Sequence, residues 1–142
     1  MNILAIDVAY NDVKRTGSAA CVLFEGWDAT VADNFLTQPF QNVADYVPGE
    51  FWRRELPIAL ELLTWIATGW PADHQPDLVI VDGYVDLEQG RPGLGRHLFE
   101  RLGRTTPVVG IAKSKYVAAV AIDVFRGESK RPLIVTAAGI AV

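Results

Sequence analysis

The sequence predicts an α/β domain in which a mixed β-sheet, opening with a three-stranded antiparallel meander, is flanked by helices. Three apolar strands separated by short polar turns occur within residues 2–37. An amphipathic helical pattern follows over residues 50–68. Two mainly aliphatic strands, 78–81 and 107–112, then bracket a second helical pattern over residues 93–102. Strands that alternate with helices pair in parallel, whereas strands joined by tight turns pair antiparallel, so one sheet is expected to contain both.

The meander is expected to consist of strands at residues 2–10, 19–24 and 29–37. Residues 11–18 and 25–28 connect them, and both segments are polar and contain glycine, which is typical of turns.

The first helical pattern places Phe51, Ile58 and Leu62 on one face at three- and four-residue steps. Glu55 lies on the same face, and a charged residue on an apolar face needs a partner. Pro57 falls inside the pattern, so it either kinks the helix or marks its true beginning.

Two of the predicted strands end in a carboxylate. The strand 2–6 is followed directly by Asp7, and the aliphatic run 78–81 is followed by Asp82 and Gly83. An open α/β sheet binds its ligands at the carboxyl ends of its strands. Converging carboxylates, including Glu55, would suit Mg²⁺ or Mn²⁺, which prefer oxygen ligands. The alternative is that each aspartate merely caps a loop or a helix.

The last elements are expected to form a hairpin from residues 117–125 and 132–137. The resulting order, β-β-β-α-β-α-β-β-β, is the ribonuclease H-like arrangement. In that fold, acidic residues on the central strands hold a divalent metal over a phosphodiester. We find no second domain, so residues 1–142 are predicted to form a single domain.

Composition excludes several classes of protein. Half of the 142 residues are hydrophobic and 21% are charged, which is ordinary for a globular protein. The net charge of −4 counts against coating nucleic acid through bulk positive charge. One cysteine, Cys21, excludes an internal disulfide framework. There is neither an apolar run of about 20 residues nor a signal peptide, so we expect a cytoplasmic protein without membrane contact.

The segment 46–57 is dense in functional residue types. Tyr46 precedes the turn signal Pro48-Gly49, and Arg53 and Arg54 follow. An exposed tyrosine can stack on an unpaired base, and arginine can hold phosphate. The alternative is that Tyr46 packs on the domain while the arginines are solvated. Arg54 could equally pair with Glu50 instead of contacting a nucleic-acid backbone.

Five motifs in order resemble those of the endonuclease V family, metal-dependent nucleases that act near deaminated purines such as inosine. They are Asp7-Val8-Ala9-Tyr10, the segment Tyr46 to Pro57, Val81-Asp82-Gly83, Gly93-Leu94-Gly95-Arg96-His97-Leu98, and Val109-Gly110-Ile111-Ala112-Lys113. The resemblance implies a ribonuclease H-like fold and a Mg²⁺- or Mn²⁺-dependent endonuclease that hydrolyses a phosphodiester near inosine in DNA or RNA.

The resemblance also implies roles for individual residues. Asp7, Glu55 and Asp82 would bind the metal, and Lys113 would lie near the scissile phosphate. Tyr46 would act as a wedge between bases. Candidate nucleic-acid contacts are Tyr46, Pro48, Gly49, Arg53, Gly83, His97 and Lys115; for His97, packing or a hydrogen bond to a neighbouring group is the main expectation.

The chain departs from the family in the loop after Gly83. The family continues with Asn/Gln-Gly and then His-Pro-Arg, whereas this chain has Val85 at the second glycine and Glu88-Gln89-Gly90 at His-Pro-Arg. Valine is expected to add bulk where glycine lets the backbone approach closely. Family members usually continue into a further C-terminal helix, so we expect exposed apolar surface near Val142 that favours a homo-oligomer.

Two interpretations therefore stay open: a nuclease, and a catalytically degenerate module that binds nucleic acid or a protein. A cofactor enzyme on a doubly wound fold is disfavoured, because no glycine-rich phosphate loop follows any strand.

Overall fold

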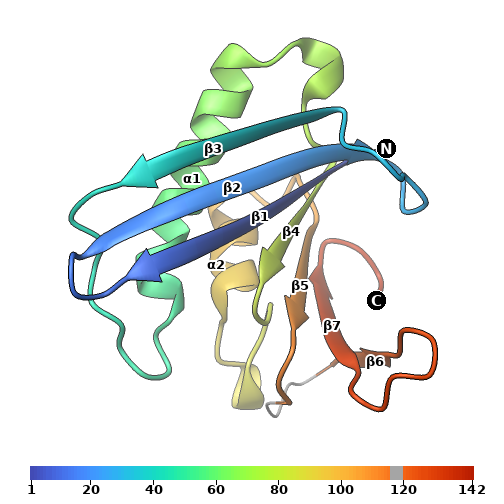
Figure 1. Ribbon diagram of the computed structural model, residues 1–142. Helices are drawn as coiled ribbons and strands as arrows, with labels where there is room; N and C mark the ends of the chain where they lie inside the picture. The colour runs from blue at the N-terminus through green and yellow to red at the C-terminus, as the bar shows by residue number, and fades with distance from the viewer. Residues whose placement is uncertain (116–119) are drawn as a thin grey trace. The chain divides into compact units, whose positions relative to one another are not determined.

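The computed structural model describes residues 1–115 and 120–142 (Figure 1). The chain divides into two compact units, Met1–Val79 and Ile80–Val142. The single domain expected for residues 1–142 stays a prediction.

The first unit contains the predicted meander. Strands β1 (Asn2–Asn11), β2 (Thr16–Glu25) and β3 (Asn34–Phe40) are antiparallel, with β2 between the other two. Ile6 pairs with Cys21, and Cys21 pairs with Leu36. Buried and exposed residues alternate along β2, as expected for a sheet with one covered face.

Strand β3 begins five residues later than the sequence predicts, at Asn34 instead of residue 29. The chain leaves β2 through Gly26 with a left-handed φ of 78°, and the Asp33 amide donates to the Leu23 carbonyl at 2.8 Å. A wide loop therefore occupies residues where the sequence suggested a short turn and the start of a strand.

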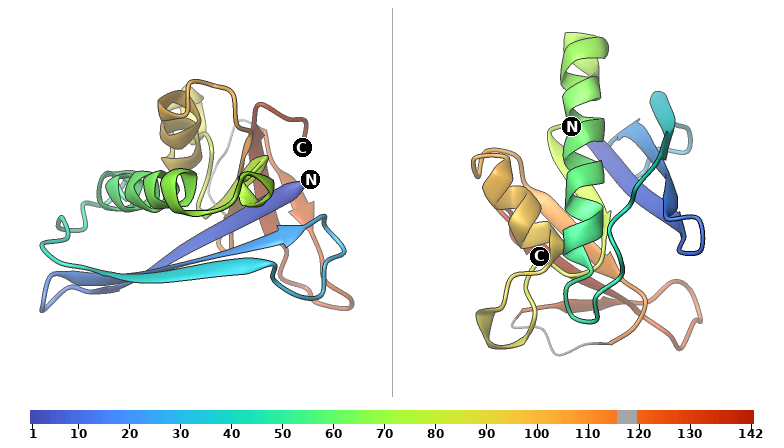
Figure 2. Two further views of the ribbon diagram at one scale, coloured as in Figure 1. Left: turned by 90° about the horizontal axis from the view of Figure 1, so that it is seen from above. Right: turned by 90° about the vertical axis from the view of Figure 1, so that its left-hand side faces the viewer.

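Helix α1 (Trp52–Gly69) lies along one face of this three-stranded sheet (Figure 2). Its buried residues are Glu55, Leu56, Ile58, Ala59, Leu62 and Ile66, so the face predicted from the helical period is the covered one. The rings of Trp65 and Phe40 stack at 5.9 Å and join the helix to β3. Pro57 lies inside the helix and does not mark its beginning.

The connection from α1, through the short 3₁₀ helix η1 (Ala72–His74), places the start of β4 beside the start of β1. The Gln75 side-chain amide donates to the carbonyls of Ile66 and Trp70 at 3.0 Å and satisfies the end of the helix. Asn2 accepts the Asp77 amide at 2.9 Å, and its own amide donates to the Asp77 carboxylate at 2.8 Å.

Strand β4 (Leu78–Asp82) begins in the first unit and ends in the second. In the second unit the strands follow the order β4, β5 (Val108–Ala112), β7 (Leu133–Ala138), β6 (Ile122–Val124). Figure 1 shows β4 and β5 pointing the same way, whereas β7 is antiparallel to both β5 and β6.

Between β4 and β5 lie the short 3₁₀ helix η2 (Glu88–Gly90) and helix α2 (Leu94–Arg101). Helix α2 contacts β5 and β7, and its Leu98 is fully buried. The mixed sheet with flanking helices is thus confirmed. The final hairpin is also present, but its first strand has only three residues. Residues 117–119 of the strand expected there lie outside the described part of the chain.

None of the described helices is both long and apolar enough to cross a bilayer.

Candidate functional site

In the first unit, two of the three predicted metal ligands influence the pKa of the same side chain, Tyr10. Asp7 is exposed near the middle of β1, and its Oδ1 accepts the Val8 amide at 2.9 Å. Glu55 projects from α1 and is only 3% exposed. The negative charges of Glu55 and Asp7 both raise the pKa of Tyr10, so β1 and α1 bring two carboxylates close enough to act on it.

Tyr10 keeps its phenol proton beyond the pH at which an ordinary tyrosine loses it, because its surroundings raise its pKa. Burial raises the pKa of its phenol most, the Glu55 charge raises it further, and the Arg54 charge opposes both. The Tyr10 hydroxyl is buried and has no hydrogen-bond partner within the described residues. A buried polar group without a hydrogen-bond partner costs free energy, so the position of the Tyr10 hydroxyl is unfavourable for folding.

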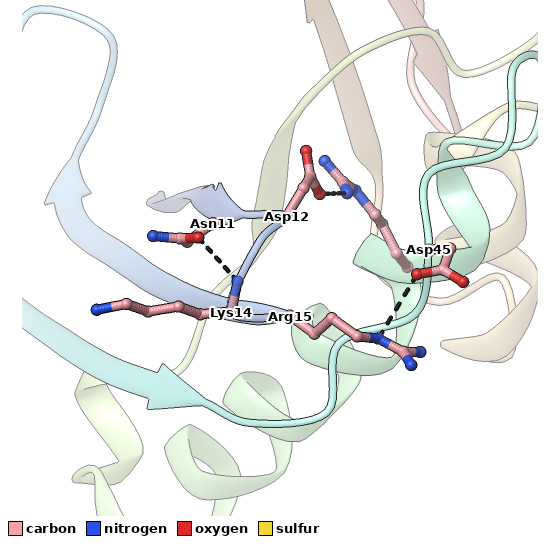
Figure 3. A network of polar contacts seen from close by, with 6 residues as sticks. Asn11, Asp12, Lys14, Arg15 and Asp45 are labelled. Atoms are coloured by element: carbon pink, nitrogen blue, oxygen red, sulfur yellow. Dashed lines mark hydrogen bonds and ion pairs between the residues drawn. The ribbon is translucent and has the colours of Figure 1, made fainter.

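The tandem arginines have different partners. Arg53 Nε lies 3.0 Å from a Glu50 carboxylate oxygen, and both side chains are largely exposed. Arg54 Nη1 lies 2.6 Å from Asp12 Oδ1, and the Arg54 side chain is only 10% exposed (Figure 3). The alternative pairing of Arg54 with Glu50 is therefore wrong; Glu50 pairs with Arg53.

Tyr46 is partly exposed to solvent and lies close to Arg54. It is 54% exposed, and its ring centroid lies 5.4 Å from the Arg54 guanidinium carbon. The chain turns directly after it: the Glu50 amide donates to the Val47 carbonyl at 2.9 Å, and Gly49 has a left-handed φ of 79°. Pro48 is exposed on this turn. Tyr46 thus contacts the domain and also faces solvent, and its contact with a base stays a prediction.

In the second unit, Asp82 is exposed at the end of β4 and Gly83 follows with φ 121°. The Gly83 amide donates to the Ile111 carbonyl at 2.8 Å. Lys113 is exposed two residues after Ile111, just past the end of β5. Strands β4 and β5 thus place Asp82 and Lys113 at corresponding ends, where ligands bind in α/β sheets.

In the loop after Gly83, the Val85 side chain points into the core of the second unit. Val85 is 1% exposed, and its Cγ2 lies 2.6 Å from where a Cβ on Gly95 would be. The Val85 amide donates to the buried Thr136 hydroxyl at 2.9 Å. The valine therefore adds its bulk to the core of the unit, in the space that a glycine in α2 leaves open.

The remainder of this loop is held by an ion pair. Arg96 Nε and Nη2 contact the two Asp86 carboxylate oxygens at 2.9 and 2.6 Å. This bidentate contact raises the pKa of Arg96, so the guanidinium stays charged.

The other predicted nucleic-acid contacts have local partners. Lys115 Nζ lies 3.5 Å from Asp123, and both side chains are at least one-third exposed. His97 is half-buried on α2, and its amide donates to the Gly93 carbonyl at 3.1 Å. Their roles toward nucleic acid stay predictions.

The candidate metal ligands suit a hard cation by their chemistry, since all three are carboxylates. Among the described residues, no three side chains from His, Cys, Asp and Glu converge closely enough to hold a metal. The first unit supplies Asp7 and Glu55, and Asp82 belongs to the second. The three-carboxylate site therefore stays a prediction.

Sequence reasoning left Tyr10 and Asp12 without a role, although Tyr10 belongs to one of the five motifs. In a strand, residues four apart point to the same face, so Tyr10 lies on the face of the buried Ile6. This spacing could have predicted that the Tyr10 phenol is partly buried. Asp12 gives no such signal, because turns are commonly acidic.

Comparison with solved structures identifies the fold. The chain superposes on Ciona intestinalis endonuclease V with a TM-score of 0.83 at 16% identity, covering 96% of this chain and 70% of that one. For the catalytic domain of human endonuclease V the TM-score is 0.79 at 20% identity, with 97% and 68% covered. The chain therefore shares the ribonuclease H-like fold of these two structures.

Sequence comparison identifies the family. The Endonuclease V family model matches residues 1–142, so the chain belongs to the endonuclease V family. Endonuclease V from Xylella fastidiosa is 31% identical over 115 residues, which is 81% of this chain and 44% of that protein. The chain thus spans under half the length of this curated relative. Nucleases of the family generally depend on a divalent metal.

Proposed function

We propose that this chain is a Mg²⁺- or Mn²⁺-dependent endonuclease that hydrolyses a phosphodiester near a deaminated base, inosine, in DNA or RNA. Family membership supports the reaction class. The Ciona relative was solved with a 23mer DNA containing an inosine followed by a ribo-adenosine, which supports the substrate class.

The observation that carries the proposal is the pair of carboxylates in the first unit. Glu55 is a nearly buried carboxylate on an otherwise apolar helix face, and its charge, like that of Asp7, raises the pKa of Tyr10. Carboxylate oxygens are the ligands that hard divalent cations prefer, so this pair supports a site that binds Mg²⁺ or Mn²⁺.

Each residue has a distinct role in the proposed mechanism. Asp7, Glu55 and Asp82 would hold the metal, which supplies water activation and stabilises charge on the phosphate. Lys113 carries an exposed ammonium past the end of β5 and would offset charge that develops on the phosphate. Tyr46 would stack on a base beside the cut, and the exposed Arg53 would contact the backbone.

The test is cleavage of single-stranded oligonucleotides, inosine-containing or undamaged, made as DNA and as RNA, with Mg²⁺, Mn²⁺ or EDTA. We expect cutting that requires metal and follows inosine. Asp7→Asn and Asp82→Asn should each lower the rate by at least about 100-fold, because each removes a ligand charge. Asp28→Asn is the matched control, since it neutralises an exposed aspartate in the loop after β2. Full activity of both ligand variants would disprove the metal assignment.

A second candidate function, a catalytically degenerate binding module, is favoured by the loop after Gly83, where Glu88-Gln89-Gly90 replaces the His-Pro-Arg of the family. A binding module would bind inosine-containing oligonucleotides, with or without Mn²⁺, and would not cut them. Folded protein that binds but shows no turnover with either metal would favour this function.

A further inference from the structure

Arg54 occupies a position between two aromatic rings. Its guanidinium carbon lies 3.7 Å from the Tyr10 ring centroid and 5.4 Å from that of Tyr46. A guanidinium over an aromatic face is favourable, and more so when it is desolvated. With its side chain only 10% exposed, Arg54 thus links a partly buried tyrosine of β1 to an exposed tyrosine of the turn before α1.

Arg54 is poorly placed to contact phosphate. Its Nη1 is engaged by Asp12 at 2.6 Å, and its Nε is buried without a partner among the described residues. The neighbouring Arg53 has a side chain that is 55% exposed; it pairs with the partly exposed Glu50, and its guanidinium carbon lies 5.1 Å from the Trp52 ring centroid. Of the two arginines, Arg53 is the one a nucleic-acid backbone can reach.

Asp12 comes from the turn between β1 and β2, which is tied to the segment that leads to Tyr46. In this turn the Lys14 amide donates to the Asn11 side chain at 3.0 Å. The Val43 amide donates to the Arg15 carbonyl at 2.9 Å, and Arg15 Nε lies 3.5 Å from Asp45 (Figure 3). One turn therefore holds both Arg54 and the chain that carries Tyr46.

The Asp12–Arg54 pair differs from an ordinary surface ion pair. The Asp12 side chain is 73% exposed, but its partner is nearly buried. Ion pairs between exposed side chains contribute little to stability, whereas a buried charge that loses its partner is strongly destabilising. Removal of the Asp12 charge should therefore make Arg54 leave its place between the rings and turn toward water.

We propose that Asp12 is a positioning residue: it holds the Arg54 guanidinium on Tyr10 and thereby fixes where the Tyr46 ring lies. The consequence for nucleic acid rests on the function proposed above, in which Tyr46 stacks on a base. Asp12 then affects the affinity for nucleic acid by fixing the position of the Tyr46 ring, although Asp12 does not itself contact the substrate.

The first test monitors the Tyr46 ring without using activity. Protein labelled with fluorotyrosine gives a fluorine NMR signal for each tyrosine, and Tyr46→Phe assigns the one of interest. We expect Asp12→Asn and Arg54→Lys to shift the Tyr46 signal, since lysine keeps the charge but not the planar stack. Glu100→Gln is the matched control, because it removes a carboxylate from the exposed Arg104 pair. An unchanged Tyr46 signal in both Asp12→Asn and Arg54→Lys would overturn the proposal.

The second test is a double-mutant cycle on binding of a single-stranded inosine oligonucleotide. Asp12→Asn should weaken binding by roughly three- to tenfold, less than the full loss of a base stack. In a Tyr46→Ala background it should have no further effect. The dependence of affinity on salt should stay the same, whereas loss of a phosphate contact would lower that slope by about 1. Equal effects of Asp12→Asn in both backgrounds would refute the coupling.

The two proposals fail in different ways. Wild-type protein that neither binds nor cuts the oligonucleotide would disprove the proposed function, and the NMR test would still decide what holds Tyr46. An active wild type with an unmoved Tyr46 signal in Asp12→Asn would disprove the positioning role alone.

Discussion

Gly95→Ala tests the fit between helix α2 and the loop after β4. A Cβ on Gly95 would lie 2.6 Å from Val85 Cγ2 and 3.0 Å from Val85 Cα. Val85 cannot easily turn away, because it is β-branched and 1% exposed. Overpacking of this kind typically costs about 1–3 kcal/mol. Alanine's better helix propensity returns at most about 1 kcal/mol, and less near a helix end.

The expected net loss is about 1–2 kcal/mol of unfolding free energy, or a fall in Tm of roughly 3–8 °C. Val85→Ala alone should cost about 1.5–3 kcal/mol, because it removes two buried methyl groups and leaves a cavity. Combined with Gly95→Ala, it removes the closest contact, so the two losses should overlap by about 1 kcal/mol. The overlap is incomplete because the 3.0 Å contact with Val85 Cα remains.

Guanidinium chloride unfolding followed by circular dichroism measures all three variants. Gly69→Ala is the matched control, since Gly69 ends α1 and nothing lies within 4 Å of the added Cβ. It should be neutral or slightly stabilising. If Gly95→Ala behaved like Gly69→Ala, or if the losses of the Val85 pair simply added, the packing argument for this loop would be wrong.

Two further predictions concern buried polar groups, one in each unit. Thr136→Val should lower stability by about 1–3 kcal/mol in urea unfolding, because the Val85 amide would lose the hydroxyl that it donates to at 2.9 Å; an unchanged midpoint would contradict this. Since burial and the charges of Glu55 and Asp7 raise the pKa of Tyr10, the unfolded state loses this proton first, and stability should fall as pH rises above about 10. In Tyr10→Phe, stability should fall less over this pH range. The difference in phenolate absorbance between wild type and Tyr10→Phe should appear only at pH values above those at which an ordinary tyrosine ionises. Ionisation at the ordinary pH would contradict the burial argument.

Local patterns in the sequence were sufficient for most of the secondary structure. The helical period predicted which face of α1 is covered and placed Glu55 on it, where it is 3% exposed. Aliphatic runs predicted β4 and β5, and the motif order indicated the family that the full-length match establishes. These features succeed because burial repeats with the period of the element that carries it.

The boundaries that depend on loops were less predictable. Apolar residues around position 31 suggested an early start to β3, but Val31 is 74% exposed in a wide loop. A loop residue contacts whatever the fold brings near it, and hydrophobicity alone does not distinguish it from a strand residue.

The side-chain environment of the candidate site was decided by tertiary structure. Asp12 and Arg54 are 42 residues apart in sequence, and Val85 meets Thr136 across 51. Sequence alone supplied the residue types: carboxylates, a tyrosine beside a turn, and two arginines. Only the folded chain decided which arginine is buried and that Val85 points into the core over Gly95, because those outcomes depend on packing between segments distant in sequence, which no local pattern encodes.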